Sequence, residues 1–227
     1  MSHYLFMYYD PWLPDQWCHA LTPGHLSWQL SPARLLREWQ YSLIFWMGCN
    51  TSTDMVTLSD NINEKLSMAA FQGKYEEVEG YISQGADPAW TNDEGWSALH
   101  GAVADGAADV RVARLLLDSG WNINTRKTES VPILEGRTSG GLRPLHSAAL
   151  CGQVECVKLL AERGADLDCQ DDNMWTPLHW AAEGANSDVV RTLLSCGADR
   201  SIKNKDGKTA EDIANSKDDD DTRSAFT

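Results

Sequence analysis

Apolar residues recur along this chain in pairs of short segments with helical spacing. Leu178, Ala181 and Ala182 share one face of a predicted helix. After a short turn, a second apolar face follows, made by Val189, Val190, Leu193 and Leu194. Pro177 suits a first helical position, because its missing N–H would have no helical partner there. Gly197 suits the left-handed residue that ends the second helix. The pattern predicts two short helices whose apolar faces need neighbours to cover them.

The same pattern returns at a nearly constant interval. The sequence Thr-Pro-Leu-His begins at Thr176, a related tetrapeptide begins 33 residues earlier at Arg143, and another begins 33 residues later at Thr209. Ser97 begins a further copy, 46 residues before Arg143. Gly-Ala-Asp triplets or their relatives keep step, at Gly85–Asp87, Gly120–Asn122, Gly164–Asp166 and Gly197–Asp199. A period of about 33 residues indicates a stacked repeat array.

These tetrapeptides and triplets resemble the ankyrin repeat family over residues 62–216. The resemblance implies an all-α solenoid of stacked helix-turn-helix units with β-turn fingers. We expect an ankyrin repeat domain at residues 61–216 and a truncated fifth repeat that begins near Lys208. Residues 1–60 are expected to be a non-repeat segment, disordered or in part spurious, and 217–227 an acidic disordered tail. The family binds many kinds of partner, so the resemblance implies a binding role without naming a ligand.

An insertion separates the second repeat from the third, between Arg126 and Gly141. It adds about eleven residues relative to the spacing of the sibling repeats. Most of its residue types favour loops, but Ile133 and Leu134 form an apolar island at its centre. Such an island either folds back onto the array or contacts a partner.

The first 46 residues differ in composition from the rest. They hold five of the ten tryptophans and no lysine. Met47 and Gly48, followed by Cys49 and Ser52, then fit the N-myristoylation pattern, with Cys49 as a palmitate acceptor. The pattern acts only at an N-terminus, so one hypothesis is that translation begins at Met47, and the alternative is a chance match. Two acyl chains would anchor the protein stably, whereas one gives marginal affinity.

Charge and cysteine usage narrow the function classes. The net charge is -14 and the pI about 4.7, which disfavours nucleic acid as a partner because phosphate binding needs clustered Lys and Arg. The six cysteines include no Cys-x-x-Cys pair, which favours buried thiols in a reducing compartment. No apolar run approaches the length of a membrane span. We expect a cytoplasmic monomer, with membrane association if Gly48 is lipidated.

Catalytic and metal-binding chemistry are not indicated by the residue pattern. His100, His146 and His179 recur with the repeats, and the ankyrin resemblance implies that each hydrogen-bonds backbone near a finger. Packed helices lie about 8–10 Å apart, whereas zinc needs each nitrogen at about 2.0–2.1 Å, so one metal could not join two of them. No phosphate loop or nucleophile–base pairing is present. The sequence predicts a non-enzyme with no cofactor and no metal.

Tryptophans gather where the fingers are expected. Trp96, Leu142 and Trp175 each precede a helix-capping residue, Trp180 follows His179, and Trp90 lies in the first finger. Exposed aromatic residues are typical anchors of protein interfaces, so these residues predict a ridge that binds a protein partner. Ile133 and Leu134 in the insertion are a candidate second contact. The alternative is that the rings pack against neighbouring fingers. The sequence therefore predicts an adaptor that binds a protein on its concave surface.

Overall fold

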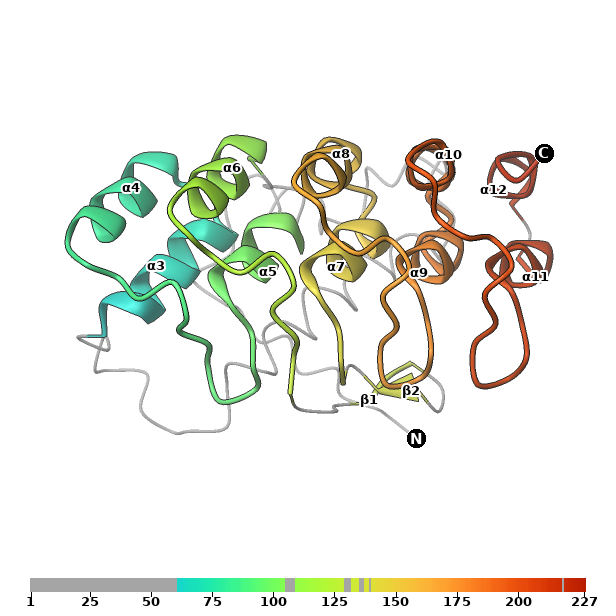
Figure 1. The fold of residues 1–227 in the computed structure, drawn as a ribbon, viewed down its shortest axis with the longest axis horizontal. Helices are drawn as coiled ribbons and strands as arrows, with labels where there is room; N and C mark the ends of the chain where they lie inside the picture. The colour runs from blue at the N-terminus through green and yellow to red at the C-terminus, as the bar shows by residue number, and fades with distance from the viewer. Residues whose placement is uncertain (1–60, 105–108, 129–131, 135–136, 139, 218) are drawn as a thin grey trace, which may run out of the picture. The chain divides into compact units, whose positions relative to one another are not determined.

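A computed structural model describes residues 61–227 except 105–108, 129–131, 135–136, 139 and 218. The helices form two parallel rows, and loops project from one side of the stack (Figure 1). The first row holds α3 (Ile62–Phe71), α5 (Ala98–Ala104), α7 (Pro144–Leu150), α9 (Pro177–Glu183) and α11 (Ala210–Asn215). The second row holds α4 (Tyr75–Ser83), α6 (Val110–Asp118), α8 (Val154–Glu162), α10 (Ser187–Ser195) and α12 (Asp220–Ser224). The stacked helix-turn-helix array predicted from the sequence is confirmed.

The core lies between the two rows and between successive units. In the fourth unit, Leu178 of α9 and Val190 of α10 are buried, as the apolar spacing predicts. Paired alanines such as Ala148–Ala149 and Ala181–Ala182 are fully buried in the first row. Their small side chains let neighbouring first-row helices pack closely, which buries faces that a lone repeat would leave in water.

The turn between paired helices needs a left-handed residue. Gly73 and Gly152 supply it with φ of 68° and 75°, and Ala185 supplies it in the fourth unit with φ of 51°. An alanine there costs about 1–2 kcal/mol relative to the right-handed conformation. The preceding residue, Gly184, has no room for a side chain. A Cβ at residue 184 would lie 2.7 Å from the Leu150 carbonyl oxygen. The turn conformation is therefore kept although alanine replaces the glycine of the sibling units.

The fingers run from the end of one unit to the start of the next. Each closes with a backbone hydrogen bond from the N–H of Asn92, Lys127, Asp171 or Asn204 to a carbonyl near the next helix, over 2.8–3.0 Å. The carbonyls belong to Trp96, Leu142, Trp175 and Lys208, respectively. The finger is therefore closed in the same way when the extra residues are present, and the insertion lies at a finger tip, where its length does not disturb the helices.

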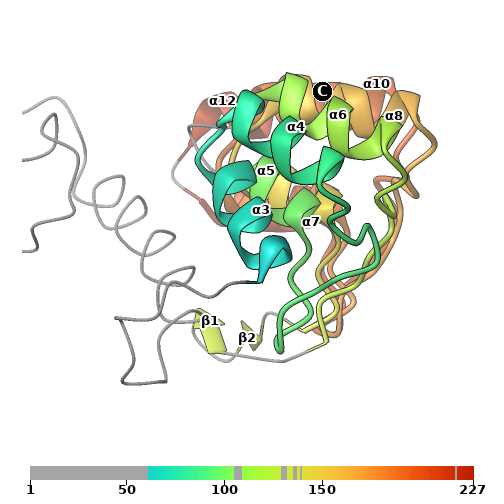
Figure 2. The same cartoon turned by 90° about the vertical axis from the view of Figure 1, so that its left-hand side faces the viewer.

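The insertion contains a small hairpin that the sequence did not predict. β1 (Pro132–Leu134) pairs antiparallel with β2 (Arg137–Thr138). Pro132 lies opposite Thr138, and Leu134 opposite Arg137. The hairpin is an addition to an otherwise helical array. Seen end-on, it lies at the finger side of the stack (Figure 2).

Residues 219–227 are folded against the array, contrary to the expected disordered tail at 217–227. α12 packs against α10 and α11 as the second helix of the fifth unit. Thr222 and Phe226 are buried, with exposed fractions of 0% and 2%. Thr222 lies in α12, and Phe226 lies in the turn that follows the helix. The acidic run before them obscured this packing in the sequence, and the fifth repeat is not truncated.

Candidate functional site

The base of each finger is fixed by an Asx turn. Asp87, Asn122, Asp166 and Asp199 occupy equivalent positions, and the side chain of each accepts a hydrogen bond from the backbone N–H two residues later. The distances are 2.8–3.2 Å. Such side-chain bonds replace missing backbone partners in a turn. The Gly-Ala-Asp triplets of the sequence thus mark the places where the fingers start.

In each finger without the insertion, a second polar residue accepts hydrogen bonds from the backbone of the tip. Asn92 Oδ1 accepts from the N–H groups of Glu94 and Trp96 at 3.1 and 2.8 Å. Asp171 Oδ1 does the same for Asn173 and Trp175, both at 2.8 Å. Asn204 repeats the arrangement in the last finger. These tips are rigid, because two tip N–H groups are bonded to one side-chain oxygen.

Lys127 occupies this position in the finger with the insertion, where it cannot accept a hydrogen bond. Its side chain is buried, with Nζ 3.7 Å from a carboxylate oxygen of Glu94 and 5.0 Å from the centre of the Trp96 ring. The Thr128 N–H donates to the Glu94 carbonyl at 3.1 Å. Sequence reasoning missed Lys127, although it lies seven residues after Gly120, as Asn92 lies seven after Gly85.

The other side of the insertion is fastened to the next finger. Arg126 forms an ion pair with Asp172, and the Asp172 N–H donates to the Gly140 carbonyl at 3.0 Å. Gly141 has φ of 79°, and a Cβ there would lie 2.8 Å from the Asp172 nitrogen. The base of the hairpin is therefore held between two neighbouring fingers.

The predicted tryptophan ridge is wrong for three of its members. Trp175, Trp180 and Leu142 are only 2%, 0% and 4% exposed. The Trp180 indole N–H donates to Asp171 Oδ2 at 3.0 Å, and the Trp175 and Trp180 rings lie 5.1 Å apart. Burial raises the pKa of the Asp171 carboxyl. The two rings therefore pack within one finger and the helix that follows it, α9, and are not available to a partner.

The remaining predicted contact residues differ in status. Trp90 and Trp96 are half-buried in the first finger and stay candidates. Ile133 and Leu134 lie in β1, but their side chains are outside the described part of the structure. Gly48 and Cys49 lie outside the described residues altogether. Two other large apolar residues are exposed among those described, Met68 at 46% and Met174 at 42%.

The repeat histidines connect each unit to the next, as expected. The Nδ1 atoms of His100, His146 and His179 each accept the backbone N–H three residues earlier, at 3.0–3.2 Å. Each proton therefore lies on Nε2, which donates to a carbonyl in the following finger. His100 donates to the Leu142 carbonyl at 3.3 Å. His146 lies 3.0 Å from the Cys169 carbonyl oxygen and 3.2 Å from that of Trp175, and His179 donates to the Lys208 carbonyl at 3.1 Å.

Burial lowers the pKa of His100 to about 3 and of His146 to about 4.

These groups are unsuited to catalysis. The histidine nitrogens are bonded within the fold and stay neutral at pH 7. Burial raises the pKa of Cys169 to about 12 and of Cys156 to about 11, so neither forms the nucleophilic thiolate at neutral pH. Among the described residues, no cluster of three His, Cys, Asp or Glu could hold a metal. The described helices include none long and apolar enough to cross a membrane.

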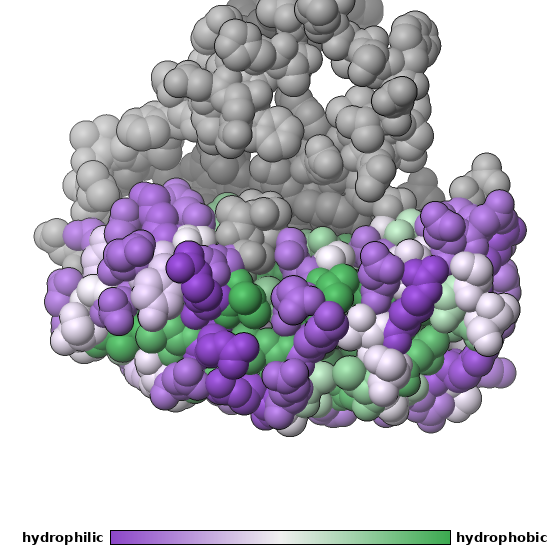
Figure 3. All heavy atoms as spheres, turned by 90° about the horizontal axis from the view of Figure 1, so that it is seen from above, coloured by the Kyte–Doolittle hydropathy of each residue, from purple (hydrophilic) through white to green (hydrophobic). Residues whose placement is uncertain are grey.

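The second-row helices present a mostly hydrophilic outer face with hydrophobic residues between them (Figure 3). Its charges pair locally, for example Lys158 with Glu155 at 2.8 Å and Arg191 with Asp188 at 3.0 Å. Exposed pairs of this kind contribute little. Local pairing and solvation account for this face, so the fingers are the better candidate for specific recognition.

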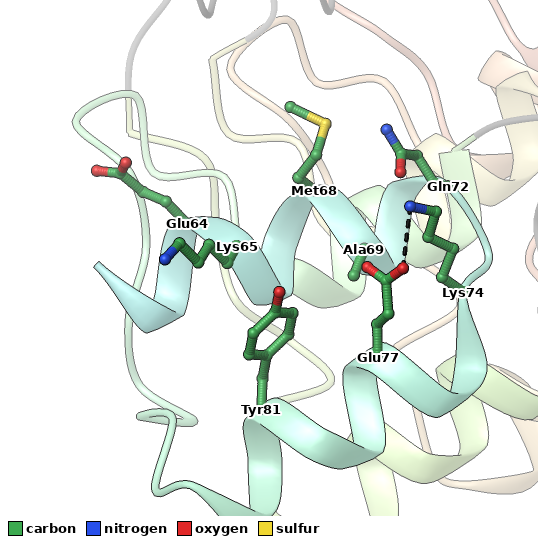
Figure 4. A pocket seen from close by; sticks show the side chains of 8 residues that line it. All are labelled: Glu64, Lys65, Met68, Ala69, Gln72, Lys74, Glu77 and Tyr81. Carbon is green, nitrogen blue, oxygen red and sulfur yellow. Dashed lines mark ion pairs between the residues drawn. The ribbon is translucent and has the colours of Figure 1, made fainter. Parts of the chain in front are cut away.

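A shallow groove lies at the N-terminal end of the described stack. It measures about 300 Å³ and is formed by α3 and α4 (Figure 4). Lys74 and Glu77 form an ion pair of 3.0 Å on its wall, and Met68 and Tyr81 also line it. Polar side chains here suit the first repeat of the described stack, because the outer face of an end unit meets water.

Comparison with known proteins identifies the family. A family model of ankyrin repeats in three copies matches residues 66–171 and 145–222, and the chain belongs to this family. It is 44% identical over 91 residues to human protein phosphatase 1 regulatory subunit 27, covering 40% of this chain and 56% of that protein. It is 36% identical over 105 residues to mouse protein phosphatase 1 regulatory subunit 12A, covering 46% and 9%.

A longer similarity involves a plant protein. The chain is 30% identical over 211 residues to the E3 ubiquitin-protein ligase KEG of Arabidopsis thaliana, covering 86% of this chain and 12% of that protein. The chain spans about half the length of subunit 27 from human and mouse, 56% and 47%. The matched stretch is thus about half of subunit 27 but a small part of KEG and of subunit 12A.

Replacing Trp175 with alanine should destabilise the array. The ring is 2% exposed and contacts both Trp180 and His179, so its loss should cost roughly 3–5 kcal/mol of unfolding free energy. Urea denaturation measures this cost. Trp90→Ala, at a half-buried ring, is the control and should cost clearly less. Equal costs would contradict the assigned burial.

The buried histidines should make the array sensitive to mild acid. Their folded pKa values lie below the unfolded value of about 6.5, so unfolded chains take up protons that folded chains do not, and stability falls as pH drops below about 6.5. His100 and His146 should each remove about 2 kcal/mol between pH 7 and pH 5. Asp171 acts in the opposite sense, because its pKa is raised. Denaturant titrations at pH 7, 6 and 5 measure the slope, which His146→Asn should reduce.

Proposed function

We propose that this chain is a non-catalytic adaptor that binds the catalytic subunit of protein phosphatase 1 through its fingers and first-row helices. The similarity to two regulatory subunits of that phosphatase carries the choice of partner. The ankyrin architecture supports the mode of action. A binding surface formed by repeated fingers needs no reacting group, and the buried repeat histidines, Cys156 and Cys169 offer none.

The rigidity of the fingers supports a recognition role. Their tips are held by side-chain oxygens such as Asn92 Oδ1 and Asp171 Oδ1, and the insertion is fixed by Lys127 and Arg126 to the fingers on either side. A surface that is already ordered loses little conformational entropy when a partner binds. Half-buried Trp90 and Trp96 would supply aromatic contact area on the first finger.

The charge of the chain indicates the chemistry of the partner surface. At a net charge of -14, association is faster with a surface that carries basic residues. Exposed Asp93 and Asp206 place acidic groups at two finger tips. The complex should therefore form more slowly as ionic strength rises, while apolar contacts at the centre of the interface persist.

Purified phosphatase catalytic subunit should bind the full chain with one-to-one stoichiometry. Calorimetry or surface plasmon resonance measures the dissociation constant, expected in the micromolar range or tighter. In a matched variant, residues 127–141 are replaced by Asn-Lys-Asp-Gly, the tip at 204–207. This variant should fold and bind more weakly if Ile133 and Leu134 contact the partner. An absence of binding at concentrations of tens of micromolar would exclude this partner.

A lipid anchor is a second candidate function, motivated by the pattern that begins at Met47. In this case Gly48 carries myristate, Cys49 carries palmitate, and the array recruits its partner to a membrane. Gly48→Ala should move the expressed protein from the membrane to the soluble fraction, and Cys49→Ser should weaken its retention. Unchanged fractionation of Gly48→Ala would eliminate lipidation at this position.

A further inference from the structure

One finger breaks a rule that the other three obey. The residue before the last position of each finger has a left-handed backbone. Glycine occupies this position at Gly95, Gly141 and Gly207, with φ of 74–82°. Met174 occupies it in the third finger, with φ of 60°. The left-handed region crowds the Cβ of any L-residue against the backbone, so methionine is a strained choice for this turn.

The surrounding bonds enforce this strained conformation. The Met174 N–H donates to the Asp171 carbonyl at 3.0 Å, and its carbonyl accepts from Gln170 Nε2 at 3.1 Å. The neighbouring residues are tied to both adjacent fingers, through Asp172 to the Gly140 carbonyl and through the Asn173 carbonyl to the Lys205 N–H. Strained residues persist when their surroundings over-determine them, and they cluster at functional sites.

The side chain gains little from the fold in return. Met174 is 42% exposed, so much of its apolar surface remains in water. Glycine would remove both the backbone strain and the exposed thioether, and three sibling fingers already use it. Ala185 is a useful contrast, because it is similarly left-handed, with φ of 51°, but presents only a methyl group at a helix turn.

We propose that Met174 is an anchor of the partner interface, and that its side chain inserts into an apolar pocket on the phosphatase catalytic subunit. This assignment rests on the proposed function. Methionine suits such a role because its unbranched, polarisable chain adapts to irregular pockets. Asp172 and Asn173 are partly exposed beside it, and they give the apolar anchor a polar rim, as is usual around an interface hot spot.

Substitution by glycine separates the two roles of this residue. Met174→Gly should raise the melting temperature by roughly 2–4 °C, because the strain is relieved, and should weaken binding to the catalytic subunit by about tenfold or more. Ala185→Gly is the matched control, with a similar thermal gain and an unchanged dissociation constant. Met174→Leu keeps the strain and the apolar bulk, so its dissociation constant should stay within about threefold of the parent value.

Each outcome bears on a different claim. Equal binding by the parent chain and Met174→Gly would overturn the anchor and leave the proposed function standing. A lower melting temperature for Met174→Gly would assign the residue to stability and also overturn the anchor. Failure of the parent chain to bind the catalytic subunit would overturn both the proposed function and the assignment of Met174 to that interface. Analytical sedimentation of the free proteins tests whether Met174 instead contacts a second copy of this chain. A dimer that forms with the parent chain and is lost in Met174→Gly would show that it does, and would overturn the phosphatase as the partner of Met174.

Discussion

The hydrogen bond from each repeat histidine to the following finger is the interaction on which the array depends. His100, His146 and His179 each receive a backbone N–H at the start of their own helix and donate to a carbonyl of the next finger. One side chain thereby fixes a helix start and joins two repeats. Because the ring is buried and neutral, the bond is made without a charge in the core. Apolar stacking supplies the driving force, and the histidines set the register of successive units.

The finger region tolerates change that the helices would not. Replacement of an ordinary tip by the longer insertion leaves the closing bond at Lys127 and Leu142 intact. The polar acceptor used by Asn92, Asp171 and Asn204 is lost there. A buried Lys127, held by Glu94 and the Trp96 ring, takes its place. Recognition can therefore vary at the tips while the packing of the stack is preserved.

The repeats were predictable because period, capping residues and alanine pairs all indicate the same local structure. The burial of Trp175 and Trp180 was not, because an aromatic residue at a finger position can contact either a partner or the neighbouring ring. The burial of Trp180 depends on Asp171, whose carboxylate accepts a hydrogen bond from the Trp180 indole N–H. The repeat period does not indicate that these two residues form a pair. α12 was missed because an acidic run precedes Thr222 and Phe226. Met174 requires backbone geometry, since a methionine in a loop carries no sign of its φ value.

The insertion also affects how the array opens. Its base is bonded to the finger before it through Thr128 and Glu94, and to the finger after it through Gly140 and Asp172. An ordinary solenoid is a chain of nearest-neighbour couplings that can fray from any weak interface. Here the central units share hydrogen bonds outside the helical stack, so we expect the amide protons of α5, α7 and α9 to exchange as one cooperative block. The terminal units, which lack these additional bonds, are expected to open first.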